Sequence, residues 1–137
     1  MSGLIANGSY VLQAGNDETV LYEGDYAGQT TIELSESLDN FERVKIEWCH
    51  GAGAGAYPTV NNRIIEEYPT TTNDFMCLLG RYENAVYRMI AFFTNNKTSL
   101  TVKWCGFSSG NTAIWSKLTT PEIVPVKVIG INRKGSA

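Results

Sequence analysis

Few side chains in this sequence could carry out acid, base or nucleophilic chemistry. His50 is the only histidine, so a histidine-dependent nucleophile would need Cys49 or a distant serine beside it. Neighbouring residues on a strand point to opposite faces, which argues against a Cys49–His50 dyad. The same reasoning separates Glu66 from Glu67, and a glycosidase pair roughly 5 to 10 Å apart would have to come from distant strands. We therefore expect that the protein is not an enzyme.

Metal and phosphate sites are not indicated either. Cys49, Cys77 and Cys105 are evenly spaced, but their flanking residues do not repeat and no Cys-x-x-Cys pair occurs. With a single histidine, a zinc site is not expected, and we interpret the cysteines as small buried hydrophobic residues in a reducing compartment. The glycines at 51–55 precede Tyr57 and Pro58 rather than Gly-Lys-Ser/Thr, so they do not form a phosphate-binding loop. We expect neither a cofactor nor a metal.

The remaining chemistry is non-covalent binding by aromatic and amide side chains. The chain has 7 Tyr, 5 Phe and 3 Trp, and pairs of amide residues lie between its apolar segments. Aromatic faces contact the C–H groups of sugars, and short polar side chains bind the hydroxyls. Most of the aromatic residues are expected in the core, so the better ligand candidates lie in or near loops. These candidate ligand-binding residues are Tyr57, Asn61, Asn62, Tyr82 and Trp115.

Strands must position these loops, because apolar and polar residues alternate along much of the chain. In residues 41–49 the apolar side chains fall on one face and the charged ones on the other, and residues 99–105 repeat the pattern. We predict that both strands line the core and that six side chains point inward together: Val44, Ile46, Trp48, Leu100, Val102 and Trp104.

Residues 85–94 are apolar on both sides except at Arg88, which predicts a central strand covered on both faces, with a buried helix as the alternative. Asn95 to Lys97 then turn the chain into the next strand, which favours a hairpin. Further strands are expected at residues 20–22, 30–34, 63–68, 75–79 and 124–131, with Pro125 at a strand start or an edge. Residues 35–40 could form one helical turn, and residues 50–58 a glycine-rich loop.

Length and charge set limits on the class of protein. A chain of 137 residues with 43% hydrophobic residues buries one core, so the strands predict a single all-β domain, an antiparallel β-sandwich of jelly-roll type. The net charge of -3 is spread along the chain, which argues against nucleic-acid binding. No apolar run reaches about 18 residues, so no membrane insertion is expected. The first residues do not form a secretory signal.

Several segments together resemble the distal receptor-binding (head) domains of tailed-bacteriophage tail fibres. The opening part of the resemblance covers residues 21–24, 31–35, 38–41 and 44–48, and its end covers residues 126–131. Between them the chain matches by the rhythm of its strands. The resemblance implies a β-sandwich receptor-binding domain over residues 19–137, and residues 1–18 then form a linker or the end of a shaft.

The resemblance also implies a homotrimer in the phage tail of the virion, made in the host cytoplasm without a signal peptide. Its partner would be a glycan or protein on the bacterial surface. Two alternatives remain open: a carbohydrate-binding module or lectin without a fibre, and a structural trimerising cap of a virion fibre without a ligand. Molar mass in solution separates the trimeric readings from a monomeric module, and binding to whole bacteria separates the adhesin from the cap.

Overall fold

The computed structural model describes residues 17–24, 29–50, 63–79, 87–109 and 114–135. Most of these residues lie in strands, and the helical turn expected within residues 35–40 is a single 3-10 turn. The described elements are β1 (Glu18–Glu23), β2 (Thr31–Glu33), η1 (Leu38–Asn40), β3 (Phe41–His50), β4 (Arg63–Pro69), β5 (Asp74–Leu79), β6 (Tyr87–Asn95), β7 (Ser99–Ser109), β8 (Ser116–Lys117) and β9 (Ile123–Arg133).

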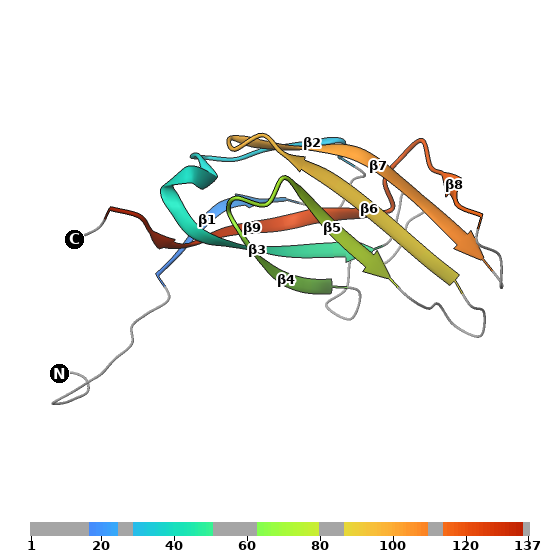
Figure 1. Cartoon of the computed structure of the whole chain (residues 1–137), viewed down its shortest axis with the longest axis horizontal. Helices are drawn as coiled ribbons and strands as arrows, with labels where there is room; N and C mark the ends of the chain where they lie inside the picture. Colours follow the sequence, from blue (N-terminus) through green and yellow to red (C-terminus); the bar gives the residue numbers. More distant parts are fainter. Residues whose placement is uncertain (1–16, 25–28, 51–62, 80–86, 110–113, 136–137) are drawn as a thin grey trace, which may run out of the picture.

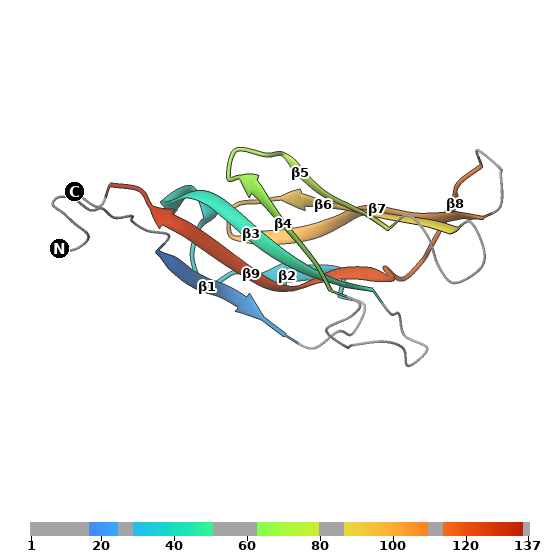
Figure 2. The same ribbon diagram turned by 90° about the horizontal axis from the view of Figure 1, so that it is seen from below.

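The strands form two antiparallel sheets that pack face to face. One sheet has the strand order β1-β9-β3-β4, and the other has the order β2-β7-β6-β5, with β8 paired to β7 (Figures 1 and 2). This arrangement confirms the predicted all-β antiparallel sandwich. β1 begins at Glu18, one residue before the expected start of the domain, and residues 1–16 of the expected linker lie outside the described residues.

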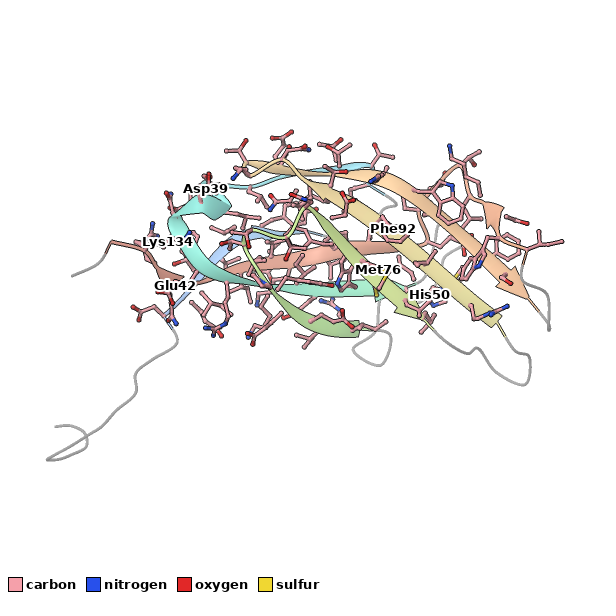
Figure 3. The ribbon with its side chains drawn as sticks, viewed as in Figure 1. Asp39, Glu42, His50, Met76, Phe92 and Lys134 are labelled. Atoms are coloured by element: carbon pink, nitrogen blue, oxygen red, sulfur yellow. The ribbon has the colours of Figure 1, made fainter. Side chains whose placement is uncertain are left out.

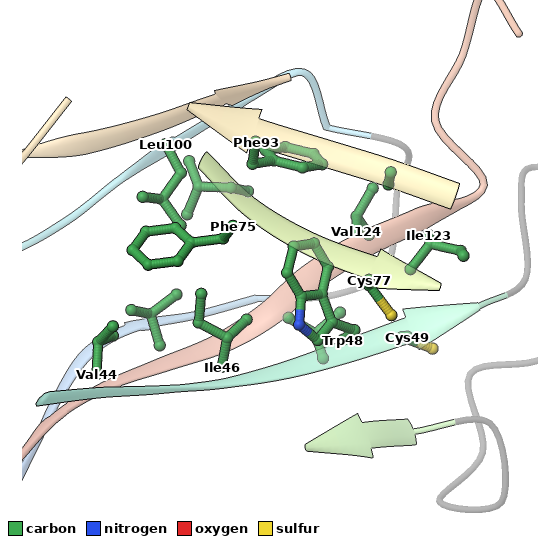
Figure 4. Close-up of a cluster of buried hydrophobic side chains, with 14 of the residues drawn as sticks. Val44, Ile46, Trp48, Cys49, Phe75, Cys77, Phe93, Leu100, Ile123 and Val124 are labelled. Atoms are coloured by element: carbon green, nitrogen blue, oxygen red, sulfur yellow. The ribbon is translucent and has the colours of Figure 1, made fainter. Parts of the chain in front are cut away.

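The core lies between the two sheets and is built by the alternation that the sequence predicts. Val44, Ile46 and Trp48 on β3 are fully buried, as is Leu100 on β7 (Figure 4). The indole of Trp48 meets the ring of Phe93 on β6 edge to face, with 5.8 Å between the ring centroids. Four of the six predicted core residues are therefore confirmed as fully buried, and side chains from facing sheets hold the two layers together.

Trp104 does not point into the core, because a β-bulge in β7 reverses the alternation of inward and outward side chains. Phe92 pairs with Trp104 and Phe93 pairs with Val102, which leaves Lys103 as an extra residue on β7. Val102 is partly buried and packs against the core, whereas Trp104 shares the outer face with Phe92. Cys105 takes the inward position beyond the bulge and is only 4% exposed. The prediction that Trp104 points inward is wrong, since the alternation of residues 99–105 breaks at the bulge.

β6 is a central strand, as predicted, because it pairs with both β5 and β7. Its inner side chains, Met89, Ala91 and Phe93, are buried against the other sheet. On its outer side, however, Ile90 and Phe92 are only partly buried, so the expectation of a strand covered on both faces is wrong within the described residues. The outer face of this sheet is therefore apolar without belonging to the core.

Other local expectations agree with the structure. Pro125 is the third residue of β9. The pairing between β9 and β1 covers Lys127 to Ile131, so Pro125 lies outside it, near the start of the strand. Cys49, Cys77 and Cys105 are buried free thiols. Burial raises the pKa of all three, and raises that of Cys77 to about 12.

Candidate ligand-binding surface

The outer faces of the two sheets differ in chemistry. On the sheet that contains β3, charged side chains pair across the outer face, three times between neighbouring strands and once between β3 and β1, with β9 between them. Each exposed pair contributes at most about 1 kcal/mol, but together they mark a face made for contact with water. The pairs are Arg43–Glu67 at 3.1 Å, Lys45–Glu18 at 2.9 Å, Arg63–Glu47 at 3.4 Å and Lys127–Glu23 at 4.0 Å.

The outer face of the other sheet is apolar across three strands. Strand pairing places Met76, Phe92 and Trp104 in one row across β5, β6 and β7. The next row on this face contains Leu78, Ile90 and Gly106. Met76 is 40% exposed and Leu78 is 50% exposed. Figure 3 shows Met76 and Phe92 on neighbouring strands. The five apolar side chains, Met76, Leu78, Ile90, Phe92 and Trp104, are called the apolar face below.

The indole of Trp104 is seated over a glycine. A methyl group at position 106 would lie 2.3 Å from Cη2 of Trp104 and 2.6 Å from the carbonyl oxygen of Ser116, so only glycine leaves room for the ring. The ring therefore lies against the backbone of β7 beside β8. Within the part of the chain that the structure describes, no other ring and no cation stacks on Trp104.

A hollow of about 190 Å³ adjoins this ring. It is lined by residues of β7, of β8 and of the segment after β8: Val102, Lys103, Trp104, Cys105, Lys117, Leu118, Thr119 and Pro121. The short strand β8 is held in place because Leu118 N–H donates to the Cys105 carbonyl at 3.0 Å, and Lys117 pairs with Gly106. Such a lining can stack on a ring and donate hydrogen bonds to hydroxyl or anionic oxygens.

The charges around the hollow have identifiable partners. Lys103 Nζ donates to Asp74 Oδ2 at 2.8 Å, and this hydrogen bond lowers the pKa of Asp74. Burial raises the pKa of Cys105, the charge of Glu122 adds to this rise, and the charge of Lys117 opposes it. Burial also raises the pKa of Glu122. No carboxylate is among the described residues that line the hollow.

Of the ligand residues predicted from the sequence, only Trp115 lies in the described part of the chain. It is partly buried, and Cζ of Arg88 lies 5.6 Å from the centroid of its ring. Arg88 Nη2 also donates to Ser108 Oγ at 2.9 Å, so Arg88 links Trp115 to β7. One face of the Trp115 ring is therefore in contact with the protein. Tyr57, Asn61, Asn62, Tyr82 and the glycine-rich loop after His50 lie outside the described residues.

The groups considered for catalysis lie at the end of β3 and on β4. Cys49 Sγ donates to the backbone carbonyl of His50 at 3.5 Å. Both residues are buried at the end of β3, and burial lowers the pKa of His50. Glu66 contacts Tyr68 and Glu67 contacts Arg43, so these two carboxylates diverge as expected.

No group of three or more His, Cys, Asp or Glu side chains that could hold a metal ion occurs among the described residues. The same residues include no helix with the length and apolar character to cross a bilayer.

Sequence reasoning missed Lys103, Trp104 and Lys117. One signal was available: Gly106 follows directly after a strand pattern, and glycine within a strand indicates a bulge or a close approach of another group. Lys117 has no comparable signal, because β8 has two residues and reaches the hollow only by pairing with β7.

Fold and surface together define a β-sandwich that has one solvated face and one apolar face with an adjoining aromatic hollow. No protein-family model matches the chain, and no curated protein matches it.

Proposed function

We propose that this domain is the receptor-binding domain of a tailed-phage fibre and that it attaches the particle to a glycan of the bacterial surface without catalysing a reaction. The observation that carries the glycan part is the hollow beside Trp104. There an indole fixed over Gly106 adjoins Lys117 and Thr119. An aromatic face with a few hydrogen-bond donors at its rim suits a sugar ring. The phage part rests on the resemblance of the strand segments.

A site of this size suits a weak contact, and several copies of the domain acting together would raise the overall affinity. The hollow of about 190 Å³ is smaller than the roughly 300 Å³ at which pockets for drug-sized ligands begin. A single site would therefore hold one sugar unit. In a homotrimeric fibre tip, several sites acting together can raise the overall affinity by a factor of roughly 10² to 10⁴. We propose the homotrimer on this ground and on the resemblance.

The placement of the hollow is compatible with a fibre tip. Asn132 N–H donates to the Asp17 carbonyl at 2.9 Å, so the first and last described segments lie together at one end of the sandwich. β8, which forms one wall of the hollow, lies toward the opposite end (Figure 1). A domain joined to a shaft at the first end would keep this wall free for a receptor.

Attachment to bacteria tests the proposal. The purified chain should bind host cells or a panel of surface glycans, and Trp104→Ala should abolish binding while the far-ultraviolet dichroism spectrum is kept. Ile65→Ala is the matched control, because it removes a 57% exposed apolar side chain from the other sheet. Binding by Trp104→Ala at the level of the parent would contradict the site. Release of sugar fragments from envelope polysaccharide, abolished by changing one carboxylate, would contradict the non-catalytic role.

A structural role as a trimerising cap is the second candidate, and the apolar face favours it. Its exposed aliphatic side chains on β5 are suited to contact with a second copy of this chain, whereas the ion pairs on the opposite face are suited to water. Leu78→Glu should then lower the molar mass measured by light scattering, and Ile65→Glu should not. A cap would bind no glycan, whether or not Trp104 is changed.

A further inference from the structure

We infer that the hollow beside Trp104 takes a neutral sugar unit and that the carboxylate of Glu122 prevents a preference for anionic sugars. This inference rests on the proposed glycan binding at the same site, and it adds the charge class of the ligand and a residue that sets the selectivity. It is carried by the positions of four charged side chains in and around the hollow: Asp74, Lys103, Lys117 and Glu122.

The ammonium group of Lys103 is held outside the hollow. Its Nζ donates to Asp74 Oδ2 at 2.8 Å. Asp74 begins β5, and β6 lies between β5 and β7, so this ammonium group extends across the outer face of the sheet and away from β8. The charge of Lys103 is therefore paired with a carboxylate at a distance from the wall that β8 forms.

The charge of Lys117 is opposed by that of Glu122. Among the described residues that line the hollow, Lys117 is the only other one with a charged side chain, and it is exposed on β8. Glu122 is partly buried and directly follows Pro121, which lines the hollow. A partly buried charge is screened less by water and salt than an exposed one. The field of Glu122 is therefore weakened less than that of Lys117.

The thiol of Cys105 responds to both charges from within the lining. Burial is the main cause of its raised pKa. The negative charge of Glu122 adds to this rise in pKa, and the positive charge of Lys117 opposes it by a smaller amount. The two charges therefore act on the same wall with opposite signs, and the negative charge has the larger effect there.

A charged ligand gains little from this arrangement. An anionic group would be attracted by Lys117 and repelled by Glu122, and a cationic group would meet the reverse. A neutral sugar instead gains from stacking on the indole of Trp104 and from hydrogen bonds to its hydroxyls, and neither depends on a net charge. The hollow is therefore suited to a neutral sugar, whose binding should be insensitive to salt.

Titrations of the full chain with matched neutral and charged probes test the inference. The phosphate pair is glucose and glucose 1-phosphate. The carboxylate pair is a galacturonic acid oligosaccharide and the same oligosaccharide with its carboxyl groups reduced to alcohols. At low ionic strength, the neutral member that binds should bind at least as tightly as its charged partner. Its affinity should change less than about twofold in 1 M salt, where the screening length is about 3 Å.

Two variants of the opposed charges locate the effect. Glu122→Gln keeps the size of the side chain and leaves Lys117 unopposed. The affinity for glucose 1-phosphate should then rise about fivefold at low ionic strength, which is the effect of one charge about 4 Å away in water, while the affinity for glucose stays the same. Lys117→Gln should lower the affinity for glucose 1-phosphate, so the inference is still tested if Glu122→Gln does not fold.

Glu42→Gln is the matched control for the loss of a negative charge. Glu42 is exposed at the end of the sandwich away from β8 (Figure 3). This variant should bind both glucose probes as the parent does. Near-ultraviolet dichroism of Glu122→Gln and Glu42→Gln should match the parent, which excludes a change in packing.

The possible failures separate the inference from the proposed function. Tighter binding of a charged probe than of its neutral partner, lost in Trp104→Ala, would overturn the neutral preference and keep the glycan site. Equal affinity for glucose 1-phosphate in the parent, Glu122→Gln and Lys117→Gln would overturn the role of Glu122. Attachment to whole bacteria that is lost in 1 M salt would also overturn the inference. Absence of Trp104-dependent binding for all probes and for whole bacteria would instead overturn the proposed function.

Discussion

Replacing Trp48 by alanine should lower stability much more than replacing Trp104 by alanine. The indole of Trp48 lies on the inner face of its sheet, in the core, whereas the indole of Trp104 lies on the outer face of the other sheet. Trp48 is fully buried between the sheets and contacts Phe93. Its removal should leave a cavity and lower the free energy of unfolding by about 3 to 5 kcal/mol. That loss is a large part of the 5 to 15 kcal/mol that is typical of a domain. Trp104 is only partly buried on the outer face, so its removal should cost less than about 2 kcal/mol.

Urea unfolding followed by far-ultraviolet dichroism measures both costs without depending on tryptophan fluorescence. The free energies of unfolding come from linear extrapolation, and the slopes of the transitions should agree between variants. Trp48→Phe is a useful third variant, because it keeps an aromatic ring in the core and should recover most of the loss. Equal costs for the two alanine variants would mean that Trp104 packs in the core and that β7 lacks the bulge.

Two further predictions concern single residues. Hydrogen bonds from Arg133 lower the pKa of Glu36 from 4.5 to about 2, so its stabilising contribution is present above about pH 4.5 and is lost as the pH falls toward 2. The difference in urea midpoint between the parent and Glu36→Gln should therefore shrink over this range, and a constant difference would refute the assignment. Gly106→Ala places a methyl group against the Trp104 ring and should change the near-ultraviolet spectrum and weaken glycan binding with the sheets intact. An unchanged spectrum with full binding would show that the ring is not seated there.

Strand positions could be predicted from the sequence because alternation reports directly which side chains are buried. The strand expected at residues 41–49 is β3 at Phe41–His50, and the strand expected at residues 75–79 is β5 at Asp74–Leu79. From Val44 to Trp48 and from Phe75 to Cys77 burial alternates and the inward side chains are apolar, so period and burial agree. Local sequence was sufficient wherever one phase of the alternation was clearly apolar.

Around Trp104 two phases were equally apolar, and the sequence could not choose between them. Leu100, Val102 and Trp104 form one alternating set of apolar residues, and Cys105 and Phe107 belong to the other set. The structure uses both sets and changes from one to the other at the bulge. The shift depends on how β7 pairs with β6, which is a tertiary property that alternation along one strand does not contain.

The candidate site was missed for a related reason. Aromatic residues in expected loops were preferred as ligand contacts, which favoured Trp115, while Trp104 was assigned to the core because it lies on a strand. Lys117 reaches the hollow only because β8 pairs with β7. Apolar residues on both sides of β6 were likewise interpreted as burial on both sides. A local pattern indicates that a face is apolar, but it does not say whether the same chain covers it.

The three buried cysteines allow local unfolding of this protein to be measured by thiol labelling. Cys49 lies in the sheet of β3, whereas Cys77 and Cys105 lie in the other sheet, and all three thiols are at most 4% exposed. Because burial raises their pKa, little thiolate is present at neutral pH and alkylating reagents must wait for the chain to open. The labelling rate of each cysteine then measures how often its own strand is exposed. If Cys49 were modified well before Cys77, the sheet of β3 would open as a separate unit, so the two layers of the sandwich can be compared without introducing any probe.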